Sequence, residues 1–152
     1  MTEDTGAMMA FFTAAEEARI VAAIQAAERN TSGEIRVHIE KRLEKDVLTE
    51  AQRTFAKLGM HRTQARNGVL IFIAPEHHQF AIIGDQGIHQ QVGEHFWQAE
   101  RDLIATYFRQ GDFAGGICAA VEQVGEKLKA FFPFQSDDTN ELPDEISYGK
   151  DR

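Results

Sequence analysis

The sequence predicts an α/β protein, a three-layer α/β/α sandwich in which a small mixed β-sheet is flanked by about four helices. The 152 residues fit one domain of ordinary size. Four segments carry apolar residues at the spacing of amphipathic helices, and three short segments have the patterns of strands. Few strands with apolar faces and several amphipathic helices bury those faces best as helix layers on a sheet.

The first helix is expected to begin at a capping box formed by Thr13 and Glu16 and to run to about Arg29. The polar segment 30–33 breaks its pattern. Residues 34–40 then alternate between apolar and polar side chains, which is the period of a strand with one face toward a core.

The middle of the chain predicts a helix followed by a hairpin. Apolar residues recur at helical spacing after Asp46, and Gly59 is placed to end that helix. The run 69–74 has no polar alternation, which suits a central strand buried on both faces. A turn at 75–78 and a second apolar run at 79–83 complete the expected hairpin.

Two more helices and a tail complete the prediction. A long helix extends through Val92 to Tyr107, and another follows the candidate N-cap Asp112 and ends before Pro133. Residues 134–152 lack periodicity and are rich in Asp, Asn, Ser and Pro, so we expect a disordered acidic tail. The expected domain therefore covers residues 11–133.

Charge and cysteine content narrow the function classes. Sixteen Lys and Arg against 24 Asp and Glu give a net charge of −8, which argues against nucleic-acid binding through the phosphate backbone. The single cysteine, Cys118, cannot form an intramolecular disulfide, and we expect a small buried thiol. No apolar run approaches the ~18 residues of a membrane span, and the N-terminus is acidic, so a cytoplasmic protein is expected.

The segment 84–87, Gly-Asp-Gln-Gly, leaves a predicted strand and enters a helix. Ligand sites in α/β proteins cluster in such loops beyond strand ends. Asp85 would be a good ligand for a hard cation there, and Gly84 and Gly87 would let backbone carbonyl groups approach as further ligands. The alternative is that Asp85 caps the next helix and that the glycines make the turn.

A second candidate segment is Arg66-Asn67-Gly68, before the central strand. Asn-Gly is commonly a turn dipeptide selected for positive φ. In the functional interpretation, the Asn67 amide oxygen faces Asp85 across neighbouring strand ends and completes an oxygen-rich site. Glu34, at the start of the first strand, is a third possible ligand, or a surface acid paired with a nearby arginine.

Other kinds of site have little support in the sequence. His89 and His95 are six positions apart, so they lie on different faces of a helix, unlike a helical zinc pair. There is no Gly-x-Gly-x-x-Gly, Walker-type or Gly-x-Ser-x-Gly motif, and no catalytic residue can be assigned. Trp97 is expected to line the rim of the site or to cover the sheet.

In order and spacing, several segments together resemble a TPM domain over about residues 11–133. They are Phe11-Phe12-Thr13, Thr31–Val37 (TSGEIRV), Arg66–Ile71 (RNGVLI), Ile83–Ile88 (IGDQGI), Trp97 and Phe108-x-x-Gly111-Asp112-Phe113. The resemblance implies an α/β/α sandwich and a divalent-cation site, calcium most often, at one end of the sheet. By matching position, Asn67, Gly68 and Asp85 fall at that end, and Glu34 matches the family's strand-start acid.

Two functions remain open. The first is a binding module in which a divalent cation, calcium more readily than magnesium, orders the loops so that they recognise a protein partner. The alternative is a metal-dependent acid phosphatase acting on a phosphorylated small molecule, an activity proposed for one member of the family. In that mechanism Asp85 would hold the metal and Arg66 would neutralise developing charge.

Overall fold

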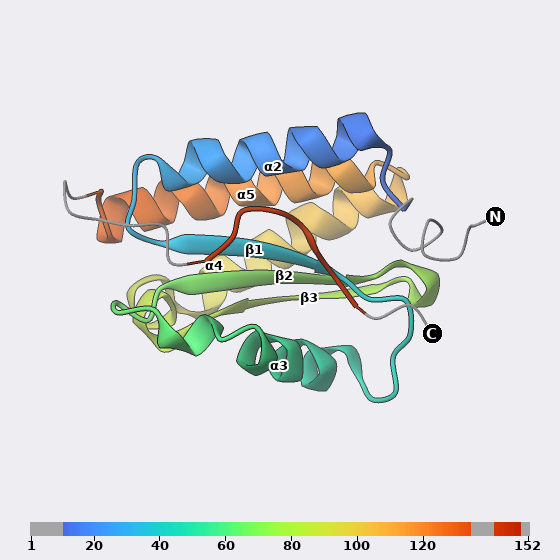
Figure 1. Cartoon of the computed structure of the whole chain (residues 1–152), viewed down its shortest axis with the longest axis horizontal. Helices are drawn as coiled ribbons and strands as arrows, with labels where there is room; N and C mark the ends of the chain where they lie inside the picture. Colours follow the sequence, from blue (N-terminus) through green and yellow to red (C-terminus); the bar gives the residue numbers. More distant parts are fainter. Residues whose placement is uncertain (1–10, 135–141, 150–152) are drawn as a thin grey trace.

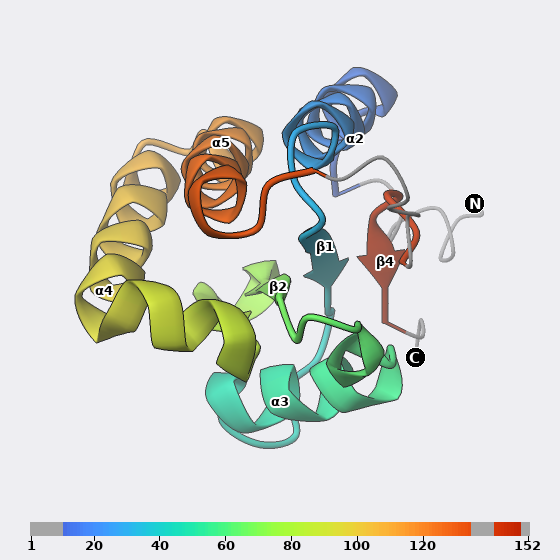
Figure 2. The ribbon, with the colours of Figure 1, turned by 90° about the vertical axis from the view of Figure 1, so that its left-hand side faces the viewer.

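The computed structural model describes residues 11–134 and 142–149. Three layers are visible, with α2, α4 and α5 on one side of the sheet and α3 on the other (Figures 1 and 2), which confirms the predicted α/β sandwich. In chain order the elements are α2 (Ala14–Glu28), β1 (Glu34–Ile39), α3 (Val47–Lys57), η1 (Met60–Arg62), β2 (Gly68–Ala74), η2 (Pro75–His77), β3 (Gln79–Gly84), α4 (Gln86–Arg109), α5 (Phe113–Phe131) and β4 (Ser147–Tyr148).

The sheet is mixed and has the strand order β3-β2-β1-β4. β1 and β2 are parallel, and α3 forms the crossover between them. β2 and β3 form the predicted antiparallel hairpin through η2. As a result, the beginnings of β1 and β2 and the end of β3 lie at the same end of the sheet, which faces the viewer in Figure 2.

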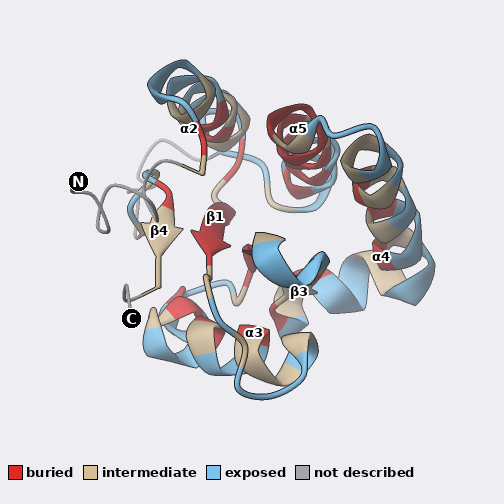
Figure 3. Cartoon of the chain, turned by 90° about the vertical axis from the view of Figure 1, so that its right-hand side faces the viewer, coloured by how far each residue is buried: buried red, intermediate tan, exposed pale blue. Residues whose placement is uncertain are grey.

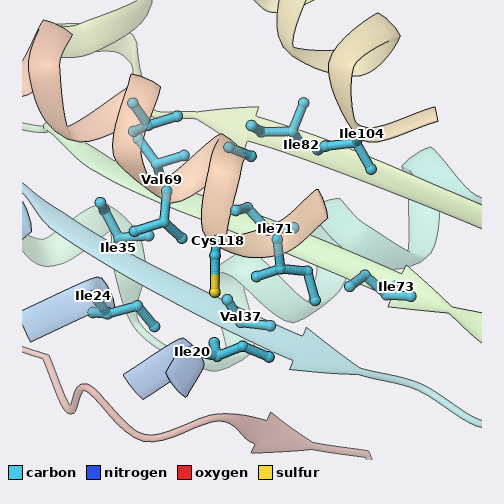
Figure 4. Close-up of a cluster of buried hydrophobic side chains, with 14 of the residues drawn as sticks. Ile20, Ile24, Ile35, Val37, Val69, Ile71, Ile73, Ile82, Ile104 and Cys118 are labelled. Carbon is cyan, nitrogen blue, oxygen red and sulfur yellow. The ribbon is translucent and has the colours of Figure 1, made fainter. Parts of the chain in front are cut away.

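Two apolar cores separate the sheet from its helices. The larger core contains the side chains of Ile35, Val37 and Ile39 from β1, which pack against residues of α2, α4 and α5. Figure 4 shows this core, with Cys118 of α5 among its apolar residues, so the expected buried thiol is confirmed. The smaller core lies between α3 and the opposite face, where Phe72 is fully buried.

The alternation in residues 34–40 predicted a strand with one face toward a core, but both faces of β1 are buried. All six residues of β1 are buried, Arg36 and His38 included (Figure 3). His38 Nδ1 lies 2.9 Å from Ser147 Oγ, and its Nε2 lies 2.9 Å from Glu40 Oε1. Alternation of residue types therefore identified the strand correctly, but it could not reveal that a distant segment covers the polar face.

The covering segment is 142–149, which the sequence assigned to a disordered tail. Ser147 and Tyr148 form β4 and pair in parallel with the end of β1, and Ile146 is buried in the larger core. The prediction failed here because a two-residue strand is too short to carry a periodic pattern. Residues 135–141 and 150–152, also assigned to the tail, lie outside the described residues.

Helix starts agree with the expected caps, but α4 contains an unexpected interruption. The capping box of Thr13 and Glu16 is present in both directions. Asp112 caps α5 by accepting from the amide of Gly115. α4 begins at Gln86 and is interrupted at Gly93, whose φ of 77° and ψ of 171° are not helical. Within the described residues, no helix combines the length and the apolar character that a membrane span requires.

Candidate functional site

The sequence-predicted residues lie at the end of the sheet seen in Figure 2. Glu34 of β1 is in register with Gly68 of β2. Asp85 follows β3, and its amide donates to the Gly68 carbonyl oxygen at 2.9 Å. Asn67 directly precedes β2, so it neighbours Asp85 across this pair of strands. We call the two segments 65–68 and 84–87 the turn pair.

Arg66 binds the Asp85 carboxylate with two hydrogen bonds. Arg66 Nε lies 2.7 Å from Asp85 Oδ2, and Arg66 Nη2 lies 2.9 Å from Oδ1. The Asp85 side chain is 7% exposed and that of Arg66 is 41% exposed. The hydrogen bonds from the guanidinium to this carboxylate raise the pKa of Arg66. The carboxylate is therefore neutralised from within the turn pair, by a side chain that still reaches solvent.

Asp85 also serves as the N-cap of α4. Its Oδ1 accepts from the amide of Gln86 at 2.8 Å, and its φ and ψ are extended, as expected for a capping residue. The capping role, which the sequence left open, is thus present in the structure. Together with the two hydrogen bonds from Arg66, the cap occupies three of the about four lone-pair sites of the Asp85 carboxylate.

The backbone of the turn pair is strained at Arg66, which has a φ of 53°. A residue with a side chain pays roughly 1–2 kcal/mol for this left-handed conformation. The sequence assigned positive φ to the Asn-Gly dipeptide, but Asn67 and Gly68 are not among the positive-φ residues. The turn is therefore made one residue earlier than expected.

Gly87 allows the two segments of the turn pair to touch. Its amide donates to the Arg66 carbonyl oxygen at 2.8 Å. A Cβ atom at position 87 would lie 2.3 Å from the Ala65 oxygen and 2.5 Å from the Arg66 oxygen. Because both atoms belong to the backbone, no side-chain rotation would relieve the clash. This glycine is required for close approach.

Asn67 is the least satisfied polar residue of the turn pair. It is 1% exposed, its amide N–H donates to Thr63 Oγ1 at 3.2 Å, and its Nδ2 donates to Ser32 Oγ at 3.3 Å. Its Oδ1 has no hydrogen-bond partner among the described residues. An unpaired buried acceptor costs about 1–3 kcal/mol. Asn67 Oδ1 is thus a buried acceptor without a partner among the described residues, in an amide group whose nitrogen binds Ser32.

Glu34 lies at the same sheet end but not beside Asp85. β2 lies between them, so their Cα atoms are about 10 Å apart, two strand spacings. The Glu34 carboxylate is buried and accepts from the amide of Leu142 at 2.9 Å. Near it, burial and a hydrogen bond with Asp144 raise the pKa of Glu28 to about 10. Glu34 therefore belongs to the contact with the C-terminal segment.

Trp97 of α4 packs against the turn pair at Gly84. It is buried, and its ring occupies the space beside Gly84, where a Cβ atom would lie 2.3 Å from the indole. The indole Nε1 donates to His89 Nδ1 at 2.9 Å. Of the two positions expected for Trp97, the structure shows the one in which the side chain covers the sheet. The side-chain packing also explains why position 84 is glycine.

Three polar contributors to this end of the sheet were missed by sequence reasoning. Thr63 and Ser32 hold Asn67, and the amide of Leu142 binds Glu34. Thr63 precedes Asn67 by four residues in a polar stretch, but nothing in that stretch distinguishes it from its neighbours. Within residues 11–134 and 142–149, no group of three or more His, Cys, Asp or Glu side chains is arranged to hold a metal ion.

The sequence and the fold of the chain are similar to those of known proteins. The sequence matches the TPM domain family over residues 8–127. The chain belongs to the TPM domain family. Its structure is similar to the NMR structure of the BA42 protein from the psychrophilic bacterium Bizionia argentinensis, with 47% sequence identity and a TM-score of 0.86, covering 91% of this chain and 96% of that one.

Two more distant structures share the fold of this TPM domain. The N-terminal domain of the cg2496 protein from Corynebacterium glutamicum is 22% identical, with a TM-score of 0.63 over 78% of this chain and 75% of that one. The N-terminal domain of a protein from P. gingivalis is 16% identical, with a TM-score of 0.66 over 78% and 77%. At these identities the likeness concerns the fold alone. Among proteins with curated descriptions, none matches the chain.

Proposed function

We propose that this TPM domain is a binding module that takes up a divalent cation, calcium more readily than magnesium, at the turn pair, and that the ordered turn pair recognises a protein partner. One observation carries the proposal. The Asn67 Oδ1 atom is buried without a hydrogen-bond partner among the described residues, next to the strand end that carries the Asp85 carboxylate. A buried unpaired acceptor requires an explanation, and a bound cation is one.

The chemistry of the available donors fits a hard cation. Asp85 offers a carboxylate with acceptor capacity left over, and Asn67 offers an amide oxygen. Calcium accepts such oxygen atoms in irregular arrangements, whereas magnesium demands a near-ideal octahedron. With Glu34 bound to Leu142 on the far side of β2, the set contains one carboxylate. A set of this kind supports weak, reversible binding.

Arg66 must leave Asp85 before the carboxylate accepts a cation. Its side chain is 41% exposed, so the guanidinium has solvent available to it. The pair is bidentate and its carboxylate is buried, so breaking it costs more than the about 0–1 kcal/mol of an exposed ion pair, and the incoming cation must replace that interaction. Arg66 therefore acts in this proposal as a competing internal cation.

The experiment is a titration of the whole protein with calcium and with magnesium, followed through backbone amide resonances. We expect calcium to shift the amides of the turn pair, and Asp85→Asn to weaken binding at least about tenfold, the loss of roughly 1.4 kcal/mol. Arg66→Ala should strengthen binding by about threefold or more, because the competing charge is gone. Asp112→Asn is the matched control, since it alters a capping aspartate outside the turn pair.

Two outcomes would contradict the cation proposal. One is calcium-induced shifts that persist unchanged in Asp85→Asn, and the other is an absence of shifts in the turn pair at millimolar calcium. A weaker affinity in Arg66→Ala would contradict the exchange step specifically. That result would mean that Arg66 organises the carboxylate for binding and does not compete for it.

The phosphatase alternative has less support from the geometry. A general base must reach the reacting water, but His89 Nδ1 already accepts from the Trp97 indole. Arg66, the residue expected to neutralise developing charge, is paired with Asp85. Turnover of a phosphomonoester that depends on the metal and is lost in Asp85→Asn would replace the binding module with the enzyme.

A further inference from the structure

Glu100 is a carboxyl group enclosed in the protein interior. It lies in α4, its exposed fraction is 0%, and neither Oε1 nor Oε2 has a hydrogen-bond partner among the described residues. Glutamate is almost never fully buried unless it is paired. Its position on the inner face of α4 is shared with Trp97 and Ile104, which are one turn away on either side and belong to the larger core.

The elements packed against α4 supply no compensating charge. β3, residues 79–84, contains no charged residue, and the charged residues of α5 from 117 onwards are exposed. These are Glu122, Glu126, Lys127 and Lys129. Cys118 is the buried titratable group of α5, and burial raises the pKa of its thiol as well. On α4 itself, Arg101 is already paired with Glu94.

Because no charge among the described residues offsets the desolvation, the ionised form of Glu100 is disfavoured in the folded protein. Burial alone raises the pKa of Glu100 from 4.5 to about 7. The group thus binds its proton in the folded protein over a range in which an exposed glutamate is ionised. Two unpaired buried oxygens are costly in either protonation state, but far more so for the anion.

Glu100 lies beyond the interruption of α4 at Gly93. The interruption divides α4 into segments 86–92 and 94–109, which turn relative to each other in Figure 2. The hydrogen bond from Trp97 Nε1 to His89 Nδ1 joins the two segments across the interruption. Trp97 precedes Glu100 by three residues on the same face, and its ring packs beside Gly84 at the end of β3.

We propose that Glu100 is a proton-operated switch that controls the packing of the second segment of α4. With the carboxyl protonated, residues 94–109 pack on α5 and β3. Loss of the proton draws the carboxylate toward water, loosens this segment and moves Trp97 relative to His89. The inference goes beyond the cation site and does not depend on it, because neither Glu100 nor the interruption at Gly93 belongs to the turn pair.

The first test follows Trp97 directly, since it is the sole tryptophan of the chain. We expect its fluorescence to change between pH 5 and pH 9 with a midpoint near 7, and the ¹³C resonance of the Glu100 carboxyl to titrate with the same midpoint. Glu100→Gln should abolish the fluorescence change. His89→Gln, which keeps an acceptor for the indole but removes the imidazole, should retain it.

The second test measures unfolding by denaturant over the same pH range. A folded-state pKa above the unfolded value stabilises the fold below pH 4.5, and this contribution is lost as the pH rises through 7. The unfolding equilibrium constant of the wild type should therefore increase, relative to Glu100→Gln, by up to about two orders of magnitude toward alkaline pH. Using the difference removes the contributions of Glu28 and of the histidines, which both proteins share.

Glu100→Leu is a second variant, to be used if Glu100→Gln does not fold. Leucine removes both the charge and the unpaired polar atoms. The proposal predicts that this variant is more stable than the wild type above pH 7 and shows no fluorescence transition. The proposal is overturned if Glu100→Gln or Glu100→Leu retains the wild-type transition, or if the carboxyl resonance titrates near pH 4.5. It is equally overturned if His89→Gln alone abolishes the transition.

Discussion

The two ends of the β2–β3 hairpin use the same backbone conformation in different surroundings. Arg66, before β2, and His78, before β3, both adopt positive φ. At the first end, the strained residue is tied to Asp85 by two hydrogen bonds and lies next to the buried Asn67. At the second end, His78 is exposed and closes the short turn of η2, with its amide donating to the Pro75 carbonyl oxygen at 3.1 Å.

The surroundings of the second end are mostly apolar. A cavity of about 230 Å³ lies there, and its lining includes Phe108, whose ring contacts the rings of Phe80 and Phe113. Its polar rim, His78 and Arg109, is exposed. The difference teaches that a left-handed residue is not by itself a sign of function. A hairpin turn explains His78, whereas Arg66 is accompanied by a buried acceptor without a partner.

The strongest expected effect is that of adding a side chain at the point where the two segments of the turn pair touch. Gly87→Ala would bring a methyl group against two backbone oxygens, and overpacking of this kind costs about 1–3 kcal/mol or more. Chemical denaturation should show this loss in unfolding free energy. Gln86→Ala, at the exposed neighbouring position, should change stability by less than about 0.5 kcal/mol. Equal effects of the two substitutions would remove the basis for treating the turn pair as one unit.

An intermediate effect is expected from removing the capping carboxylate. Asp85→Ala should destabilise the fold by about 1–2 kcal/mol, because it removes both the cap of α4 and the partner of Arg66. Asp112→Ala removes only a cap, so its cost measured in the same way should be about 1 kcal/mol. The double variant of Arg66 and Asp85 separates the two contributions, with an expected coupling energy of about 0.5–3 kcal/mol for this bidentate pair. A larger coupling would mean that Arg66 is not readily displaced.

The smallest effect compares the two strained residues directly. His78→Gly should stabilise the protein by up to about 1 kcal/mol, since it relieves the left-handed conformation and sacrifices little contact. Arg66→Gly relieves the same conformation but loses the ion pair, so the two contributions should nearly cancel. Thermal unfolding of both variants measures the difference. A clear stabilisation by Arg66→Gly would indicate that the ion pair contributes nothing to the folded state.

The predictions that succeeded concern features that extend over many residues. The four helices follow from apolar periodicity, which arises when one face packs on a core, whereas the buried β2 and the hairpin follow from apolar runs without alternation on either side of a turn. The common sheet end of Asn67 and Asp85 followed from the order of the strands. The atomic contacts at that end could not be predicted from the sequence, because the pairing of Arg66 with Asp85 depends on one left-handed residue and on side-chain rotamers.

The features that were missed are local or depend on distant contacts. In the sequence, Glu100 is an ordinary polar position of a helix, and its complete burial depends on the packing of α4 against α5 and β3, which the sequence does not display. The interruption at Gly93 could be suspected from a glycine within a helix, although most such glycines cost about 1 kcal/mol without breaking it. The burial of Arg36 and His38 depends on β4, more than a hundred residues away.

β4 has a consequence for how molecules of this protein meet one another. It pairs with only His38 and Ile39, at the far end of β1, yet the C-terminal segment continues along the outer side of that strand and binds Glu34. Open strand edges are templates for uncontrolled pairing between chains, and proteins shield them with short strands, charges and covering loops. Residues 142–149 thus cover the edge that β1 would otherwise present, and removing them is expected to leave that edge open to pairing with a second chain.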